Sequence, residues 1–330
     1  MIIKTSARQL SDGYLDRTPW FQYVLLSICF PMWGMAASLN DILITQFKSI
    51  FTLSDFASAF VQSAFYGGYF LIAIPASRVI RRWSNKVGIL IGLVCYIGGC
   101  TLFFPASHMA TYGVFLMALF AIAVGLSFLE TSCNTYSSMI GPKESSTLRL
   151  NISQTFTPVG FLSGILLGKY LIFTEGEALH RQMETLDGAG KQQLAAEMLQ
   201  RTLQPYQFII MVLVVLLVIV AITQFPRCKP LDKEEHETKA TIGETLRYLA
   251  CNSRFRFGIM AQFFYVGMQT AVWSFTIRLA LQMDAGLNER AAANYVIYAL
   301  QLAFSVSLVC FVVVLLYFGN EHRLETAESR

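Results

Sequence analysis

The sequence has 330 residues, of which 55% are hydrophobic and 14% charged, whereas soluble globular domains carry about 25% charged residues. This composition excludes an ordinary water-soluble fold, and the formal net charge of +4 is too small to indicate binding to nucleic acid. We expect an all-α polytopic membrane protein, because the apolar residues form blocks of roughly the 20 residues that cross a bilayer as one helix.

Charge-poor apolar segments predict eight membrane-spanning helices. These lie at 20–46, 54–80, 86–105, 109–140, 148–174, 204–225, 256–282 and 289–318. The connection 78–86 holds four positive charges, and loops rich in Lys and Arg favour the cytoplasmic side of a membrane. Alternation from this connection places the N-terminal segment 1–19, the central loop 226–255 and the tail 319–330 in the cytoplasm. We therefore expect a multi-pass protein of the cytoplasmic (inner) membrane, with both termini inside the cell.

Two of the predicted helices carry glycine at every fourth position. Gly88 and Gly92 form one such step on the third helix, and Gly160, Gly164 and Gly168 form two on the fifth. This spacing lets helix backbones approach closely in lipid. The stripes therefore predict tight helix packing rather than a ligand site.

Two acidic residues lie alone at membrane depth. Glu130 is the one charged residue between Ala110 and Pro142, and Asp41 is the one between Thr18 and Phe47. A charged carboxylate in the bilayer costs several kcal/mol unless it faces a wet cavity or a partner. Either acid is therefore a candidate for reversible protonation in a proton-coupled carrier. The alternative is a hydrogen bond between helices, made by the protonated acid.

Three predicted helices carry polar or aromatic side chains at near-helical spacing. They are Gln62 and Tyr66 on the second, Asn151, Gln154, Thr155 and Pro158 on the fifth, and Gln262, Tyr265, Gln269 and Trp273 on the seventh. A sugar offers hydroxyls and an apolar C–H face, which amides and aromatic rings suit. The set favours a neutral sugar over an ion, although each residue alone is also explained as a bond between helices. Pro158 predicts a bend, and Arg149 is interpreted as an interfacial anchor.

Enzyme signatures are absent from the sequence. There is no metalloprotease, serine-hydrolase or phosphate-loop motif, and the four His are isolated from one another. The seven Cys are scattered without CxxC spacing, so they indicate neither a metal site nor a disulfide framework. We expect no enzyme activity, no metal and no cofactor.

Six segments resemble the L-fucose:proton symporter family of the major facilitator superfamily. They are WGMAASLNDILITQF at 33–47, QSAFYGGYF at 62–70, IPASRVIRRWSNKVGILIGL at 74–93, LSFLETSCNTY at 126–136, GPKESSTLRLNISQTF at 141–156 and AQFFYVGMQTAVWSF at 261–275. The resemblance implies that Asp41 is the proton-coupling residue, that Glu130 and Gln154 contact the sugar, and that Phe263 or Phe264 lines the cavity.

Ser38 and Thr157 stand where the family has asparagine, which leaves open whether the sugar is L-fucose, a related deoxyhexose or a hexose. Together with the polar residues above, the candidate substrate-binding set is Ser38, Gln62, Tyr66, Glu130, Asn151, Gln154, Thr157, Gln262, Phe263, Phe264 and Gln269.

The family resemblance also implies a domain organisation. Carriers of this superfamily fold as two helical halves with the substrate between them. Here the central loop 226–255 follows a six-helix half at 20–225 and leaves room for two helices at 256–318. The segment 294–319 begins like the family's eighth helix and continues like its last. We infer a deletion of about four helices near Leu300, relative to the two six-helix halves of the superfamily.

The expected function is symport of a monosaccharide with a proton as coupling ion. The shortened second half leaves a different possibility open, a membrane remnant or interaction partner that no longer transports. A membrane enzyme is a third possibility, disfavoured by the missing catalytic motifs. The expected partners are the sugar, protons and the lipid bilayer, and the oligomeric state is open.

Overall fold

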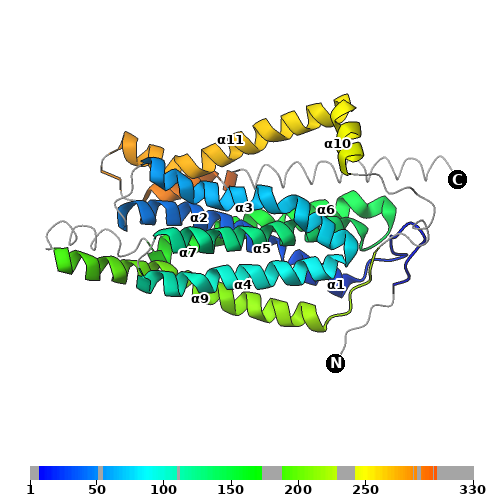
Figure 1. Ribbon diagram of the computed structural model, residues 1–330, viewed down its shortest axis with the longest axis horizontal. Helices are drawn as coiled ribbons and strands as arrows, with labels where there is room; N and C mark the ends of the chain where they lie inside the picture. Colours follow the sequence, from blue (N-terminus) through cyan, green and yellow to red (C-terminus); the bar gives the residue numbers. More distant parts are fainter. Residues whose placement is uncertain are drawn as a thin grey trace. The chain divides into compact units, whose positions relative to one another are not determined.

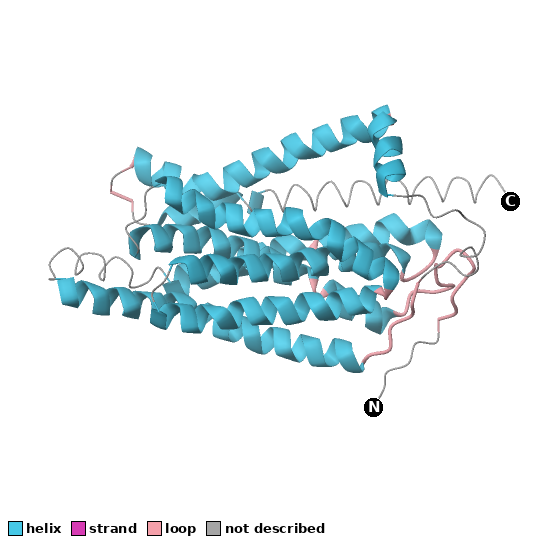
Figure 2. Ribbon diagram, viewed as in Figure 1, coloured by secondary structure: helices cyan, strands magenta, loops and turns pink. Residues whose placement is uncertain are grey.

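The computed structural model describes residues 7–50, 55–109, 112–172, 188–228, 242–284, 286–287, 291–299 and 301–302. Within these ranges every regular element is a helix, apart from one isolated antiparallel β-bridge between Gln9 and Leu15 (Figure 2). The elements in chain order are α1 (Trp20–Ser27), α2 (Phe30–Ile50), α3 (Asp55–Arg82), α4 (Asn85–Met109), α5 (Tyr112–Met139), η1 (Lys143–Ser145), α6 (Ser146–Gln154), α7 (Phe156–Leu167), η2 (Gly168–Ile172), α9 (Gly188–Ile222), α10 (Ile242–Cys251) and α11 (Ser253–Met283) (Figure 1). The all-α class expected from the sequence is confirmed.

The chain divides into two compact units, Met1–Tyr265 and Val266–Arg330. The first unit contains α1 to α10 and the beginning of α11. In the second unit, α11 continues to Met283, and residues 291–299 are helical. The boundaries expected at 20–225, 226–255 and 256–318 stay predictions, because a division by compactness does not test them.

Five stretches of the described residues are long and apolar enough to cross a membrane. They are Trp20–Asn40, Asn85–Ala106, Tyr112–Met139, Lys143–Leu171 and Leu203–Ile222. The predicted spans 54–80 and 256–282 coincide with α3 and α11, which have 28 and 31 residues but are less apolar. Most of the predicted span 289–318 lies outside the described residues.

The first predicted helix, 20–46, is interrupted. α1 ends at Ser27, four residues before Pro31. A proline ring clashes with the carbonyl group four residues earlier and has no N–H to bond it. The N–H of Cys29 instead donates to the Leu26 carbonyl oxygen at 3.0 Å, a tighter turn that separates α1 from α2.

The fifth predicted helix, 148–174, is interrupted in the same way. α6 ends at Gln154, α7 begins at Phe156, and a turn at Thr155 lies between them. The carbonyl group of Gln154 lies four residues before Pro158, so it cannot receive the usual helical hydrogen bond. The helix is interrupted near Pro158, next to a candidate sugar ligand, and the bend itself stays a prediction.

The glycine stripes mark close helix contacts, as predicted. A Cβ atom on Gly92 of α4 would lie 2.8 Å from the Gly125 carbonyl oxygen of α5. A Cβ atom on Gly160 of α7 would overlap the backbone of Pro31 in α2, and one on Gly164 would overlap Ser38. These contacts explain why α4 packs against α5 and α2 against α7 so extensively.

Arg149 joins the end of α5 to the start of α6. Its side chain is 5% exposed, and its guanidinium donates to the carbonyl oxygens of Ser137 (3.3 Å), Ser138 (2.6 Å) and Pro142 (2.8 Å). The last carbonyl groups of a helix lack partners within the helix. Arg149 supplies those partners at α5, and its interpretation as an interfacial anchor stays a prediction.

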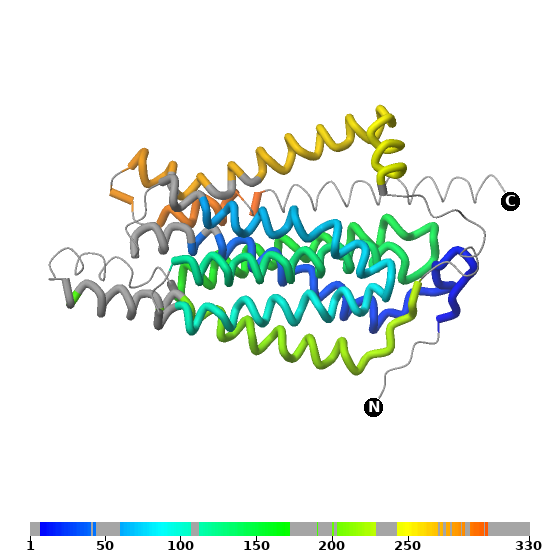
Figure 3. The backbone as a smooth tube through the Cα atoms, viewed as in Figure 1, coloured from blue at the N-terminus to red at the C-terminus, as the bar shows by residue number. Residues whose placement is uncertain are grey.

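The end of α9 is fixed by side chains from three other helices. Lys86 donates to the carbonyl oxygens of Ala221 and Thr223, both at 2.8 Å. Tyr136 donates to the Pro226 carbonyl oxygen at 2.6 Å, and Gln22 donates to that of Gln224 at 3.3 Å. These bonds turn the chain after α9 toward the N-terminal segment (Figure 3).

Candidate functional site

The centre of the candidate site is a pair of polar residues on α5. Glu130 and Asn134 are four residues apart, so their side chains lie on the same face of the helix about one turn apart. Both side chains are half-buried. Within the described part of the chain, no residue donates a hydrogen bond to the Glu130 carboxylate, whose nearest electrostatic neighbours include Tyr69 on α3. The oxygens of this carboxylate can accept hydrogen bonds from the hydroxyl groups of a ligand.

Gln154 joins this pair from the last residue of α6. Its Nε2 atom donates to the Oδ1 atom of Asn134 at 2.7 Å, and its Oε1 atom accepts from the Thr157 hydroxyl at 3.5 Å. Gln154 and Thr157 are both half-buried. Just before the break at Thr155, both ends of the Gln154 carboxamide are thus hydrogen-bonded, beside the helix that carries Glu130. Glu130, Gln154 and Thr157, which the sequence predicted, form one group with Asn134, and we call this group the polar run.

This polar run suits a polyhydroxylated ligand. A carboxylate accepts hydrogen bonds from hydroxyl groups, while a carboxamide both donates and accepts them. The searched part of the chain holds no group of three or more His, Cys, Asp or Glu residues that would hold a metal ion. The polar groups of the run are suited to recognition of a ligand by hydrogen bonds.

Other predicted ligands do not join this run. Ser38 is 1% exposed, and its hydroxyl donates to the Met35 carbonyl oxygen of its own helix at 3.0 Å. Asn151 is exposed on the same short helix as Gln154, three residues before it. Gln62 is half-buried and Tyr66 is exposed, both on α3. A contact between Ser38 and sugar would require that hydroxyl to leave its present partner.

The predicted ligands on α11 differ in exposure and in the compact unit to which they belong. Gln262, Phe263 and Phe264 are exposed, the two rings by 73% and 66%. Gln269 is half-buried and belongs to the second compact unit. Asp41 lies within α2, but its side chain is outside the described set, so its predicted role in proton coupling stays a prediction.

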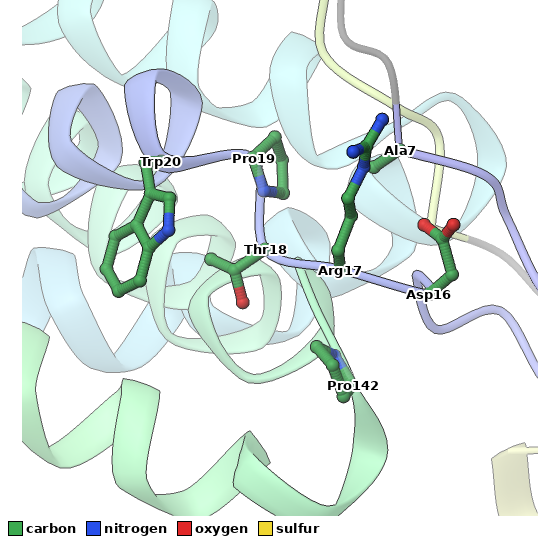
Figure 4. A pocket seen from close by; sticks show the side chains of 7 residues that line it. All are labelled: Ala7, Asp16, Arg17, Thr18, Pro19, Trp20 and Pro142. Atoms are coloured by element: carbon green, nitrogen blue, oxygen red, sulfur yellow. The ribbon is translucent and has the colours of Figure 1, made fainter.

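A surface pocket of about 480 Å³ lies elsewhere in the first unit (Figure 4). It is lined by Ala7, Asp16, Arg17, Thr18, Pro19, Trp20 and Pro142. The N-terminal segment 1–19 contributes five of these residues, α1 contributes Trp20, and the connection after α5 contributes Pro142. None of them belongs to the polar run around Glu130, so this pocket is not the candidate sugar site.

Comparison with known proteins decides the family. The profile of the Major Facilitator Superfamily matches residues 23–324. The chain belongs to the Major Facilitator Superfamily. This superfamily member is 36% identical to the L-fucose-proton symporter of Escherichia coli (strain K12) over 305 residues, which cover 92% of this chain and 67% of that protein. It is 32% identical to a glucose/galactose transporter of Brucella abortus, over 84% of this chain and 63% of the relative.

A solved structure supports the same assignment. The crystal structure of the superfamily transporter FucP in the outward conformation matches this superfamily member with a TM-score of 0.69 and 34% identity, over 86% of this chain and 68% of that one. The chain thus spans about two thirds of the length of the relatives it matches. It is a helical membrane protein of a transporter superfamily, as the resemblance implied.

Sequence reasoning missed two residues of the site. Asn134 lies one helical turn after Glu130 on the same face, a spacing that was available as a signal. Tyr69 had no such signal, because it approaches Glu130 from α3 and only the packing of α3 on α5 brings it there. The Ser127 hydroxyl, which donates to the Tyr69 carbonyl oxygen at 3.3 Å, ties the two helices together at this point.

Proposed function

We propose that this Major Facilitator Superfamily member binds a monosaccharide, L-fucose or a related hexose or deoxyhexose, together with a proton, and carries both across the cytoplasmic membrane. The observation that carries the proposal is the half-buried carboxylate of Glu130, free of described hydrogen-bond donors and next to the Asn134–Gln154–Thr157 chain of bonds. The named functions of its relatives, L-fucose-proton symport and glucose/galactose transport, support the same substrate class.

The proposed roles follow from the chemistry of each group. The Glu130 carboxylate accepts hydrogen bonds from sugar hydroxyls, and the Gln154 carboxamide adds a donor and an acceptor. Asp41 takes up the coupling proton, since an acid alone at membrane depth is more easily tolerated when it is neutral. Rocking of helical bundles around the bound sugar then exposes it to the other side of the membrane.

Replacing the carboxylate at Glu130 tests the proposal. In the purified chain, Glu130→Gln keeps the size of the side chain but replaces one acceptor oxygen with an amide donor. We expect the affinity for the preferred sugar to fall at least tenfold, equivalent to about 1.4 kcal/mol. Binding of radiolabelled L-fucose, D-galactose and D-glucose measures the effect.

The matched control is Glu144→Gln, which removes the same charge from the exposed residue Glu144 of η1. It should bind sugar as the unchanged protein does. Equal affinity in the unchanged protein and in Glu130→Gln would contradict the proposed site. A chain that binds none of the three sugars would contradict the proposed function itself.

One observation favours a second candidate function. The chain spans about two thirds of the length of its relatives, and carriers of this kind hold the substrate between two helical halves. A membrane protein that keeps the fold of the first half without transporting is therefore the alternative. Such a protein would lose only stability, not sugar affinity, when Glu130 is changed.

A further inference from the structure

The orientation of the Gln154 carboxamide is not set by its own helix. Gln154 is the last residue of α6, and the next residue, Thr155, forms the turn before α7. A glutamine side chain has several rotatable bonds, so the backbone of the helix does not by itself fix the direction of the carboxamide. Its Nε2 atom is nevertheless fixed at 2.7 Å from the Oδ1 atom of Asn134.

Asn134 brings this restraint from the helix that carries Glu130. Asn134 and Glu130 lie on one face of α5, about one turn apart. The Thr157 hydroxyl holds the other end of the Gln154 carboxamide, at 3.5 Å from Oε1. With one N–H on Asn134, the second N–H of Gln154 and a lone pair of Oε1 remain for a ligand.

We infer that Asn134 is a positioning residue, which holds the Gln154 carboxamide in the orientation that binds a sugar hydroxyl beside Glu130. This inference rests on the proposed function and deepens it. A side chain already ordered before the ligand arrives loses less conformational freedom on binding, so the affinity is higher. Asn134 thus acts on the sugar through Gln154 and without touching it.

A hydrogen bond that only stabilised the packing of α5 against α6 would give a different result when it is removed. Its loss would reduce the amount of folded protein, and with it the number of binding sites, while the surviving protein would bind sugar normally. Loss of a positioning bond raises the dissociation constant and leaves the number of sites unchanged. The effect also disappears once Gln154 itself has been removed, because coupled residues are not additive.

The experiment measures equilibrium binding of radiolabelled L-fucose, D-galactose and D-glucose to the full chain in lipid vesicles. Asn134→Leu removes the acceptor with little change in volume. We expect its dissociation constant for the preferred sugar to rise about tenfold or more, with the number of sites retained. The double variant with Gln154→Ala should bind no more weakly than Gln154→Ala alone. Thr135→Val changes the neighbouring exposed residue, whose hydroxyl donates to its own helix at 2.9 Å, and should bind normally.

Each outcome decides the inference. An unchanged dissociation constant in Asn134→Leu, or losses that add in the double variant, would overturn it while leaving the proposed function intact. If Asn134→Leu yields no folded protein, Asn134→Ala removes the same acceptor with less steric change and is judged by the same two criteria. If the unchanged chain binds none of the sugars, the proposed function fails first, and this inference with it.

Discussion

At the scale of single residues, the buried charge of Arg149 performs a structural task. Its guanidinium satisfies three carbonyl oxygens at and beyond the end of α5, and the hydroxyl of Ser145 at 2.7 Å. A planar, five-donor group can reach several acceptors at once, which an ammonium group cannot do in the same geometry. The sequence alone does not reveal this task, because the partners lie on α5 and on the connection after it, and most of them are backbone atoms.

Replacing Arg149 should therefore destabilise the fold. Arg149→Met removes the donors and leaves buried carbonyl groups unsatisfied, which we expect to lower the free energy of unfolding by roughly 2–4 kcal/mol. Arg149→Lys should recover part of the loss, because one ammonium reaches fewer of the acceptors. Thermal unfolding in detergent measures the order. Equal stability of the methionine variant and the unchanged protein would disprove the role.

The cysteine residues allow a test of burial. Cys228 is 1% exposed, and burial raises the pKa of its thiol to about 12, whereas Cys251 is exposed. The thiolate is the reactive form, so at pH 8 the Cys228 thiol stays protonated and shielded. We expect N-ethylmaleimide to modify Cys251 quickly and Cys228 only after unfolding in SDS. Peptide mass spectrometry identifies the modified residue, and equal labelling of both in the folded protein would contradict the packing described.

At the scale of helices, periodicity and proline predicted much of what the structure contains. The break near Pro158 and the close approaches at Gly92 and Gly160 follow from rules that act within one helix. The bond between Asn134 and Gln154 does not, since it joins α5 to α6 and depends on how the two helices pack. Rules that act within one helix therefore predict the helices, whereas residue pairs that join two helices depend on how the helices pack.

The contact of α7 with α2 gives a prediction for glycine. Gly160→Ala places a methyl group against the backbone of Pro31, which cannot move aside as a flexible side chain would. We expect a loss of about 1–3 kcal/mol, the usual cost of overpacking, seen as a lower unfolding temperature. Gly98→Ala on α4 is the matched control, because a Cβ there meets nothing within 4 Å. The control should be neutral or slightly stabilising, and equal losses in the two variants would contradict the close contact.

At the scale of the whole molecule, the sequence predicted the fold class and family, but less of the site. Glu130, Gln154 and Thr157 gather in one polar run, while Ser38 is engaged by its own helix. The predicted ligands on α11, Gln262 among them, are exposed. Their relation to Glu130 depends on how helical units meet, which no periodicity within a helix specifies.

The length of the chain relative to its relatives also bears on transport at the scale of the whole molecule. Alternating access moves one helical half against another around the bound sugar, and this chain spans about two thirds of the length of its relatives. We expect vesicles that hold only this chain of 330 residues to bind sugar but to accumulate it weakly under an inward proton gradient. Radiolabelled sugar uptake, with the E. coli L-fucose-proton symporter in identical vesicles as the reference, measures the difference. Saturable accumulation at the reference level would show that the chain moves sugar without a longer second half. In that case, Glu130→Gln in the same vesicles should abolish the accumulation if sugar is transported through the proposed site.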